Sequence, residues 1–295
     1  MHSKSRSRNF HPIRRISWGD RALDFEKRPY VMGILNCTPD SFYPGSRVTS
    51  VDQAVQRAMS MIEAGADILD VGGESTRPGS ETVETAEEIR RVVPVIEKIK
   101  ERWPVLLSID TRKAEVADKA LEAGADLVND ISALRDNPAL AECIAARDVP
   151  VILMHMRGEP KNMQENPFYD DVVAEILEEL IRSVDFARSC GISERRIIVD
   201  PGIGFGKRLQ DNLTILRNLP DLCSLGYPVA IGLSRKSFIG MVLDKPVDER
   251  LIGTVAANMM ALMNGADILR VHDVAEAVDT VKMFEAVRRT GVRRG

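Results

Sequence analysis

Carboxylate and amide side chains stand at the ends of several short apolar runs in this 295-residue sequence. Asp110 ends the run "LLSID", Asn129 follows the run "LV", and Asp200 ends the run "IIVD". Their oxygens suit a flat heterocycle with adjacent N–H groups, because a carboxylate accepts two parallel hydrogen bonds. These residues predict one half of a binding site, a set of acceptors for a polar ring.

A second group of side chains carries positive charge or N–H groups. Lys236 lies in "GLSRKS", and Arg270 and His272 lie in "ILRVHD". With the side-chain oxygen of Asn36, they suit a phosphate-type anion and Mg²⁺, which takes few protein ligands and prefers oxygen. A helix expected to begin near Asp273 would add its N-terminal dipole to this anion site. A substrate with a polar ring and a phosphate leaving group would fit both halves.

The elements that must position these side chains follow a repeated formula of helix end, glycine and short apolar strand. Its three copies are "EAGADILDV", "EAGADLVND" and "NGADILRV", which begin at Glu63, Glu122 and Asn264. Their separations are close to two and four units of about 30 to 35 residues, the length of a strand with its crossover helix. The intervening units complete eight apolar runs, at 30–35, 68–71, 105–109, 127–128, 151–154, 197–199, 229–231 and 268–271.

Eight such units predict a (β/α)8 TIM barrel, in which the C-terminal ends of the strands converge on one mouth. A doubly wound open sheet also alternates strands and helices, and it remains the alternative fold. The segment "ISWGDRALDF" predicts a short N-terminal hairpin. We expect residues 1–11 to form a disordered basic tail and residues 12–295 to form a single (β/α)8 domain.

Each strand-end residue also has a plainer interpretation. An aspartate after a strand is often only the N-cap of the next helix, and Asp130 and Asp273 fit that role. His155 is expected to be a structural histidine, since local hydrogen bonds readily satisfy its ring. Polar residues at all eight strand ends are harder to explain in this way, which favours a functional mouth.

Composition narrows the class of protein. A hydrophobic fraction of 44%, a charged fraction of 28% and a net charge of −4 are ordinary for a globular enzyme and do not favour a nucleic-acid partner. The four cysteines lack zinc-type spacing, which indicates buried free thiols in a reducing compartment. We find no secretory signal and no run of the roughly 18 apolar residues that span a membrane. We therefore expect a cytoplasmic protein with no membrane partner.

Seven motifs together resemble the dihydropteroate synthase family. They are "GILNCTPDSF", "DVGGESTRPGS", "SIDTRK", "VND", "DPGIGFGK", "GLSRKS" and "RVHD", and they run in the family's order from about Tyr30 to the C-terminus. The resemblance implies a (β/α)8 barrel, a homodimer and a transferase of folate biosynthesis that is the target of sulfonamides. Its substrates would be (7,8-dihydropterin-6-yl)methyl diphosphate and 4-aminobenzoate, and its products 7,8-dihydropteroate and diphosphate, with Mg²⁺ assistance. Diphosphate would leave first, before the arylamine attacks.

The same resemblance implies a role for particular residues. Pterin-binding residues would be Asp110, Asn129, Ile131, Met154, Asp200, Phe205, Lys236 and Arg270. Aminobenzoate-binding residues would be Phe42, Thr76, Arg77, Pro78, Phe205, Lys236 and Ser237. The diphosphate would be held by Asn36, Arg270 and His272, with Asn36 also on the metal. The catalytic group would be Asn36, Asp110, Asp200, Lys236, Arg270 and His272.

Two other functions are weighed against this one. A pterin-binding methyltransferase of the corrinoid-dependent type would share the ring acceptors but would not need "STRPG" and "SRKS", and a non-catalytic barrel should have lost some polar strand ends. The sequence departs from the family at Pro44, where relatives carry Asp after "TPDSF". We expect this segment to be a mobile flap that brings Phe42 against the arylamine.

Overall fold

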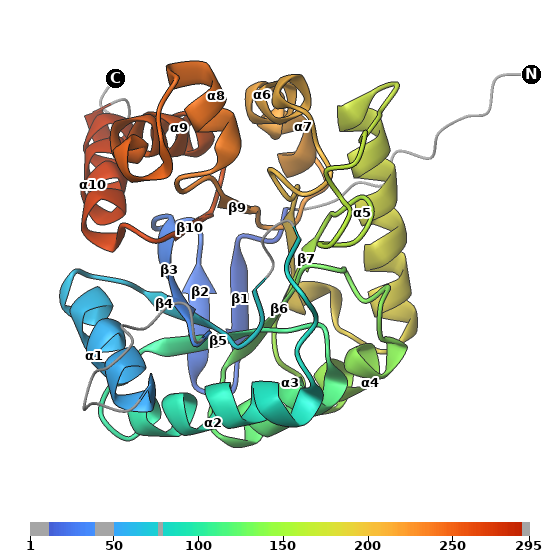
Figure 1. Ribbon diagram of the computed structural model, residues 1–295, viewed down its shortest axis with the longest axis vertical. Helices are drawn as coiled ribbons and strands as arrows, with labels where there is room; N and C mark the ends of the chain where they lie inside the picture. Colours follow the sequence, from blue (N-terminus) through green and yellow to red (C-terminus); the bar gives the residue numbers. More distant parts are fainter. Residues whose placement is uncertain (1–11, 39–49, 76–78, 291–295) are drawn as a thin grey trace, which may run out of the picture.

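The computed structural model describes residues 12–38, 50–75 and 79–290. Within them, eight strands form one parallel sheet in the order β8, β7, β6, β5, β4, β3, β10, β9 (Figure 1). A parallel bridge between Val199 and Val229 joins the two outer strands and closes the barrel. The strands are β3 Tyr30–Asn36, β4 Ile68–Gly72, β5 Leu106–Asp110, β6 Leu127–Asp130, β7 Val151–Met154, β8 Ile197–Asp200, β9 Ala230–Gly232 and β10 Ile268–Val271.

Helices follow the strands and cover the outside of the barrel (Figure 1). Each longer helix has an apolar stripe, as a helix packed on a sheet requires; α2, for example, buries Val92, Ile96 and Ile99. The described helices are α1 Ser50–Glu63, α2 Thr85–Lys100, α3 Ala114–Glu122, α4 Pro138–Arg147, α5 Val172–Ser189, α6 Leu209–Arg217, α7 Leu219–Cys223, α8 Ser237–Leu243, α9 Leu251–Met263 and α10 Val274–Thr290, with short 3₁₀ turns at Glu194–Arg196 and Val247–Glu249. None of them is long and apolar enough to cross a membrane.

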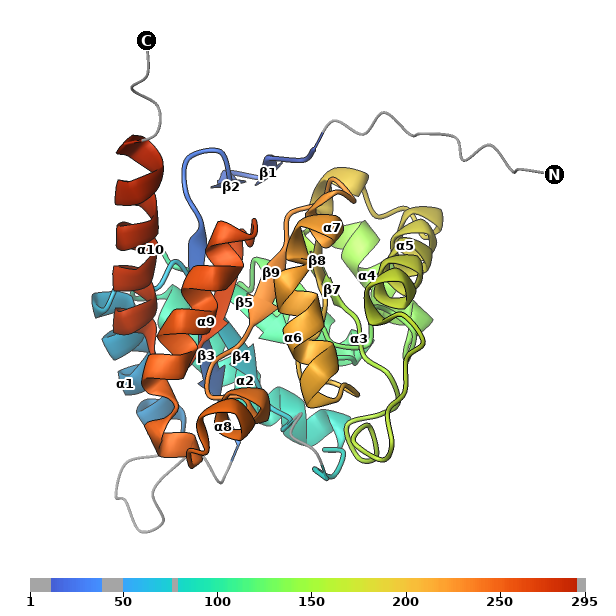
Figure 2. The same ribbon diagram turned by 90° about the horizontal axis from the view of Figure 1, so that it is seen from above.

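The predicted hairpin closes the bottom of the barrel. Strands β1 Arg15–Trp18 and β2 Arg21–Asp24 pair antiparallel. Their buried residues Ile16, Leu23 and the following Phe25 pack against apolar residues at or near the N-terminal ends of the barrel strands. In Figure 2 this hairpin lies at the end of the barrel away from α8. The opposite end is left for the loops that follow the strands.

The repeated formula of the sequence explains how the helices return to the sheet. Its three glycines, Gly65, Gly124 and Gly265, all have φ near +100° and end their helices in the left-handed region, which glycine tolerates without strain. The aspartate two residues later accepts a backbone N–H from a neighbouring strand and also binds a cation. The N–H groups belong to Val31, Leu107 and Val229, which bond Asp67, Asp126 and Asp267 at 2.9, 2.8 and 2.9 Å. The cations are Arg28, Lys100 and Arg14. Three pairs of neighbouring units are therefore tied together at the bottom of the barrel.

These observations confirm the (β/α)8 barrel with its N-terminal hairpin and exclude the open sheet. The strand boundaries agree with the expected runs to within about two residues, the usual uncertainty of such boundaries. Of the four free cysteines, Cys37 is buried and the other three are half-buried, so the expectation of buried thiols is confirmed only for Cys37. The expected basic tail, residues 1–11, lies outside the described residues.

The aspartate ties predict a stability effect that is separate from activity. Asp126→Ala leaves the Leu107 N–H and the Lys100 ammonium without their buried partner, so we expect the free energy of unfolding to fall by about 1–3 kcal/mol. The turnover number should stay unchanged, because Asp126 lies at the end opposite the mouth. Asp20→Ala is the control, since that side chain is 90% exposed. Equal urea midpoints for the two variants would contradict the role given to Asp126.

Candidate active site

The sheet register brings the predicted strand-end residues to one level of the barrel. Asn36 is paired with Gly72, Gly72 with Asp110, and Asp110 with Asn129. On the far side of the barrel, Met154 is paired with Asp200. Parallel strands in register place their last side chains at the same rim. The polar residues singled out from the sequence therefore surround a single mouth.

An arginine between two carboxylates occupies the centre of this mouth. Arg270 Nε lies 2.6 Å from Asp70 Oδ2, and one of its terminal nitrogens lies 2.5 Å from Asp110 Oδ2. Asn129 donates from Nδ2 to Asp70 Oδ2 at 3.0 Å. Asp70 is fully buried, and its Oδ1 has no hydrogen-bond partner within the part of the chain that the structure describes. A buried acceptor of this kind is a place where a bound donor would be stabilised.

Burial sets the charge state of these groups. It raises the pKa of Asp110 to about 7, although Arg270 acts in the opposite direction, and nearby Asp70 and Glu88 add to the rise. Burial alone would lower the pKa of Arg270, but Asp70 and Asp110 hold it above its ordinary value. The guanidinium thus stays charged while Asp110 lies near its titration point at neutral pH. A ligand that donates N–H groups to Asp110 would favour its ionised form.

Asp200 and Lys236 form a second polar group on the other side of the mouth. Burial raises the pKa of Asp200, against the effect of Lys236, and lowers the pKa of Lys236 to about 8. Gly202 N–H donates to Asp200 Oδ1 at 2.6 Å, and Lys236 Nζ donates to the carbonyl of Ile203. The same ammonium lies 4.8 Å from the centre of the Phe205 ring. Asp200, Lys236 and Phe205 are therefore neighbours, as the sequence interpretation requires.

An apolar wall lies beside these polar groups. Ile131, Met154, Met156 and Met163 are buried together, and the partly buried Phe205 packs against them. Ligand pockets combine such walls with a few fixed polar groups, and methionine adapts readily to a flat ring. Ile131, Met154 and Phe205 were expected in the site. Met156 and Met163 were not, because they lie in a loop whose path the sequence does not reveal.

The predicted anion group is less concentrated. His272 is half-buried, and its Nδ1 lies 3.2 Å from Ser234 Oγ. Asn36 is half-buried at the end of β3, and Ser237 is exposed at the first position of α8. Among the described residues, no three His, Cys, Asp or Glu side chains cluster as ligands for a metal ion. A site for Mg²⁺ here would rest on one amide oxygen and on the substrate's own phosphates, which is a common arrangement for that ion.

Four of the predicted aminobenzoate residues cannot be placed. Phe42, Thr76, Arg77 and Pro78 lie outside the described residues, as does Pro44. Described residues before and after 76–78 contact one another. Glu74 accepts the Val83 N–H at 2.9 Å, and Lys113 Nζ donates to both Glu74 and the Val83 carbonyl.

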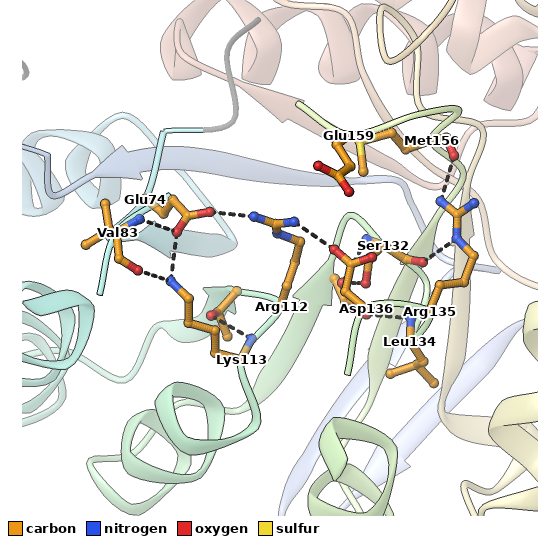
Figure 3. A network of polar contacts seen from close by, with 12 residues as sticks. Glu74, Val83, Arg112, Lys113, Ser132, Leu134, Arg135, Asp136, Met156 and Glu159 are labelled. Carbon is orange, nitrogen blue, oxygen red and sulfur yellow. Dashed lines mark hydrogen bonds and ion pairs between the residues drawn. The ribbon is translucent and has the colours of Figure 1, made fainter. Parts of the chain in front are cut away.

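Ion pairs extend from Glu74 around the rim (Figure 3). Arg112 spans Glu74 and Asp136, at 2.7 Å to each. Arg135 donates to the carbonyls of Ser132 and Met156, at 2.8 and 2.6 Å. The loops after β4, β5, β6 and β7 are thereby linked in series.

Sequence reasoning missed two kinds of residue. Asp70 precedes the strand end by two positions, and a carboxylate inside the apolar run "ADILDVGG" was the available signal. Because strand side chains alternate, Asp70 shares the interior face with Gly72. Glu74 and Arg112 lie inside recognised motifs, but nothing in the sequence shows that they pair with each other.

Comparison with known proteins gives consistent results. A family profile described as pterin binding enzyme matches residues 32–272. A protein of Synechocystis sp. called dihydropteroate synthase is 47% identical over 272 residues, which cover 92% of this chain and 94% of the relative. The structure of Xanthomonas albilineans dihydropteroate synthase with 4-aminobenzoic acid superposes with a TM-score of 0.88 at 46% identity, covering 93% and 98% of the two chains. Yersinia pestis dihydropteroate synthase in a sulfonamide drug complex gives 0.88 at 45% identity, covering 93% and 99%.

The raised pKa of Asp110 predicts a pH dependence of stability. Between about pH 4 and pH 7, folded Asp110 keeps a proton that the unfolded chain has lost, so the free energy of unfolding falls as pH rises through this window. Asp110→Asn has no such proton, and its stability should fall less steeply, by up to about 1.4 kcal/mol per pH unit. Urea unfolding of both proteins at pH 4, 5.5 and 7 measures the difference. Parallel profiles would contradict this ionisation.

Proposed function

The chain belongs to the pterin-binding enzyme family, and from that premise we infer that it catalyses the dihydropteroate synthase reaction. It is a transferase that joins 4-aminobenzoate to (7,8-dihydropterin-6-yl)methyl diphosphate and releases 7,8-dihydropteroate and diphosphate. The observation that carries this conclusion is the barrel mouth, where the buried oxygen acceptors lie beside the cationic side chains of Arg270 and Lys236. The match with the Synechocystis relative covers 92% of this chain and 94% of the relative.

We propose that the pterin ring lies inside the mouth, against its buried oxygen acceptors. The carboxylates of Asp110 and Asp200 and the amide of Asn129 would receive its N–H groups, because two parallel N–H donors match a carboxylate. Ile131, Met154 and Phe205 would cover the faces of the ring, with Lys236 and Arg270 at its edge. Binding of these donors would hold the two aspartates in their ionised forms.

The aminobenzoate would lie nearer the outside. Phe205, Lys236 and Ser237 supply a ring wall, a cation and a hydroxyl from described residues, and the lowered pKa of Lys236 still leaves it mostly protonated at neutral pH. Phe42 and the segment 76–78 would complete this site.

We propose that Asn36, Arg270 and His272 hold the diphosphate and that Asn36 contributes to a Mg²⁺ site. When bound, Mg²⁺ would neutralise charge on the leaving diphosphate. The side chains hold the leaving group in place and balance its charge from fixed positions, which requires no reorganisation during the reaction. This role needs no covalent nucleophile.

The bond changes balance without any further reactant. The bond from the pterin methylene carbon to the diphosphate oxygen breaks, and its electron pair leaves with diphosphate. The resulting cation is delocalised into the electron-rich ring, and the arylamine nitrogen then forms the new C–N bond with its lone pair. One N–H proton is released. Positioning of the two substrates in one mouth supplies most of the rate gain.

The two alternatives are not favoured. A corrinoid-dependent methyltransferase would share the acceptors, but the chain is 46% identical to a structure that holds 4-aminobenzoic acid. A non-catalytic barrel does not explain why Arg270 and two buried carboxylates are kept in the mouth, since such ion pairs stabilise a fold little or not at all.

We further propose that the protein forms a homodimer. Exposed apolar side chains gather on α8, α9 and α10, and Ile252 and Met263 among them are 78% and 65% exposed. A patch of this kind on a soluble enzyme is often an interface. Sedimentation equilibrium should give twice the mass of 32.7 kDa, and a purely monomeric species would refute the proposal.

We also propose that the reaction takes place in the cytoplasm. The four free cysteines support this, because their thiols persist in a reducing compartment. Fractionation of cells that express the chain tests it.

A direct assay tests the reaction. Purified protein should release diphosphate from the pterin diphosphate only when 4-aminobenzoate and Mg²⁺ are both present. A sulfonamide should raise the apparent KM for 4-aminobenzoate and leave kcat unchanged, because the two compounds share shape and charge. Release that does not depend on 4-aminobenzoate would refute the proposed function. Inhibition that high 4-aminobenzoate does not relieve would refute the shared pocket.

Two substitutions test the residue roles. Asp200→Asn and Lys236→Ala should each lower kcat/KM by at least about a hundredfold, equivalent to about 3 kcal/mol of transition-state binding. Both variants should remain folded by circular dichroism. Lys98→Met is a suitable control, since Lys98 pairs with Asp52 on the outer surface. Full activity in either variant would overturn the assignment of that residue.

A further inference from the structure

The loop after β8 is held by side chains rather than by a strand or helix. Four successive carbonyls, from Ile203 to Gly206, each accept a hydrogen bond from a side chain. The donors are Lys236 to Ile203, Gln164 to Gly204, Lys207 to Phe205 and Tyr169 to Gly206. The backbone around Phe205 therefore owes its conformation to these four donors. Lys236 belongs to the proposed site, but Lys207 has no role in it so far.

This loop lies directly against the backbone that follows β7. Gly202 and Gly206 both have positive φ, and a Cβ at either position would overlap the carbonyl oxygen of His155 or of Arg157. Such close approach is possible only without a side chain. The loop and the segment that begins at His155 are consequently packed directly against each other.

Lys207 joins the two segments from inside. Its side chain is almost completely buried, and its Nζ lies 3.0 Å from the Phe205 carbonyl and 3.0 Å from His155 Nδ1. On the other side of the imidazole, His155 Nε2 lies 3.1 Å from Glu179 Oε2 on α5, a close contact whose angle falls short of a hydrogen bond. Arg157 fixes Glu179 in turn, at 2.9 Å. A chain of three side chains thus runs from α5 to the carbonyl of Phe205.

The direction of each hydrogen bond in this chain follows from its chemistry. An ammonium only donates, so beside the ammonium form of Lys207 the His155 Nδ1 accepts, and the ring proton then lies on Nε2, which faces Glu179. Burial and the charge of Lys207 lower the pKa of His155 to about 4, and the nearby imidazole lowers the pKa of Glu179 to about 2. The imidazole is neutral at pH 7 and lies between Lys207 and the Glu179 carboxylate.

This connection explains how a buried ammonium is tolerated. Among the described residues, no carboxylate makes a direct ion pair with Lys207, and burial together with Lys236 lowers its pKa. The carboxylates that favour its charged form are Asp200 and, beyond the imidazole ring, Glu179. Burying the ionisable group of Lys207 costs free energy of folding, and an apolar side chain would fill the same space without that cost. We therefore expect the position of this donor to matter for function.

We propose that Lys207 is a positioning residue for Phe205, and that His155 and Glu179 hold Lys207 in place. The chain fixes the carbonyl of Phe205 and so the direction in which its ring enters the pocket. The inference rests on the proposed function, which assigns that ring to the aminobenzoate site. Lys207 does not touch substrate and acts only through Phe205.

A double-mutant cycle tests this relation. Lys207→Met should raise the KM for 4-aminobenzoate by at least about tenfold with kcat within about threefold, since a misplaced wall weakens binding before and during the reaction alike. In a Phe205→Ala background, the same substitution should change that KM by less than about twofold, because the ring through which Lys207 acts is gone. Equal effects in both backgrounds would overturn the proposal.

Glu179 has a matched control on its own helix. Glu175 lies one turn earlier on α5 and pairs with the same Arg157 at 2.8 Å, but it does not bond His155. Glu179→Met should raise the KM for 4-aminobenzoate, and Glu175→Met should not. Glu179→Gln should restore a value within about threefold of the unmodified enzyme, because an amide oxygen still faces Nε2. Equal KM values for 4-aminobenzoate in Glu175→Met and Glu179→Met would overturn the proposed role of Glu179.

A measurement without turnover separates this inference from the proposed function. Histidine ¹⁵N spectra of the complete protein should show His155, one of four histidines, as the neutral Nε2–H tautomer at pH 7. A proton on Nδ1, or an imidazolium, would overturn the chain even if the enzyme is active. If the protein lacks the proposed activity, the proposed function fails. The tautomer of His155 still decides whether Lys207, His155 and Glu179 are linked as proposed.

Discussion

The contact of Arg270 with Asp70 and Asp110 is the interaction on which the mouth of the barrel depends. The two carboxylates come from neighbouring strands and point into the same interior, where their repulsion would be strong. The guanidinium bonds both of them and makes their burial possible. Asn129 joins the same group through Asp70. Removing the Arg270 guanidinium would leave the buried carboxylates of Asp70 and Asp110 without a compensating charge. A substitution of Arg270 would therefore also disturb these two carboxylates.

The two ends of the barrel are stabilised by different means. At the bottom, the hairpin packs on the barrel through apolar side chains, and three aspartates that follow helix-ending glycines tie pairs of neighbouring strands through backbone N–H groups. At the mouth, the loops cannot use the ladder of the sheet, and side-chain ion pairs and hydrogen bonds take its place. This division lets the loops carry chemistry while the barrel itself stays intact, as is usual for the fold.

Burial also prepares the site for a ligand with hydrogen-bond donors. It raises the pKa of both Asp110 and Asp200 and lowers that of Lys236, so each group favours its neutral form more than it would in water. A polar ring that donates to the carboxylates supplies the partners that favour their charged forms. A bound ring of this kind would offset part of the electrostatic cost of burying these groups, and its binding would be linked to their protonation.

The barrel class, the hairpin, the helix-ending glycines and most of the residues around the mouth were determined by the sequence alone, because periodicity and strand ends are local properties of the chain. Asp70 could have been found in the same way. Other features depended on the tertiary structure. The pairing of Glu74 with Arg112, the joining of Met156 and Met163 to Phe205, and the chain from Glu179 to Lys207 bring together residues from different units. Only the closed barrel and its loops set the distances between such residues, and hydrogen bonds and pKa values follow from distance and burial rather than from order along the chain.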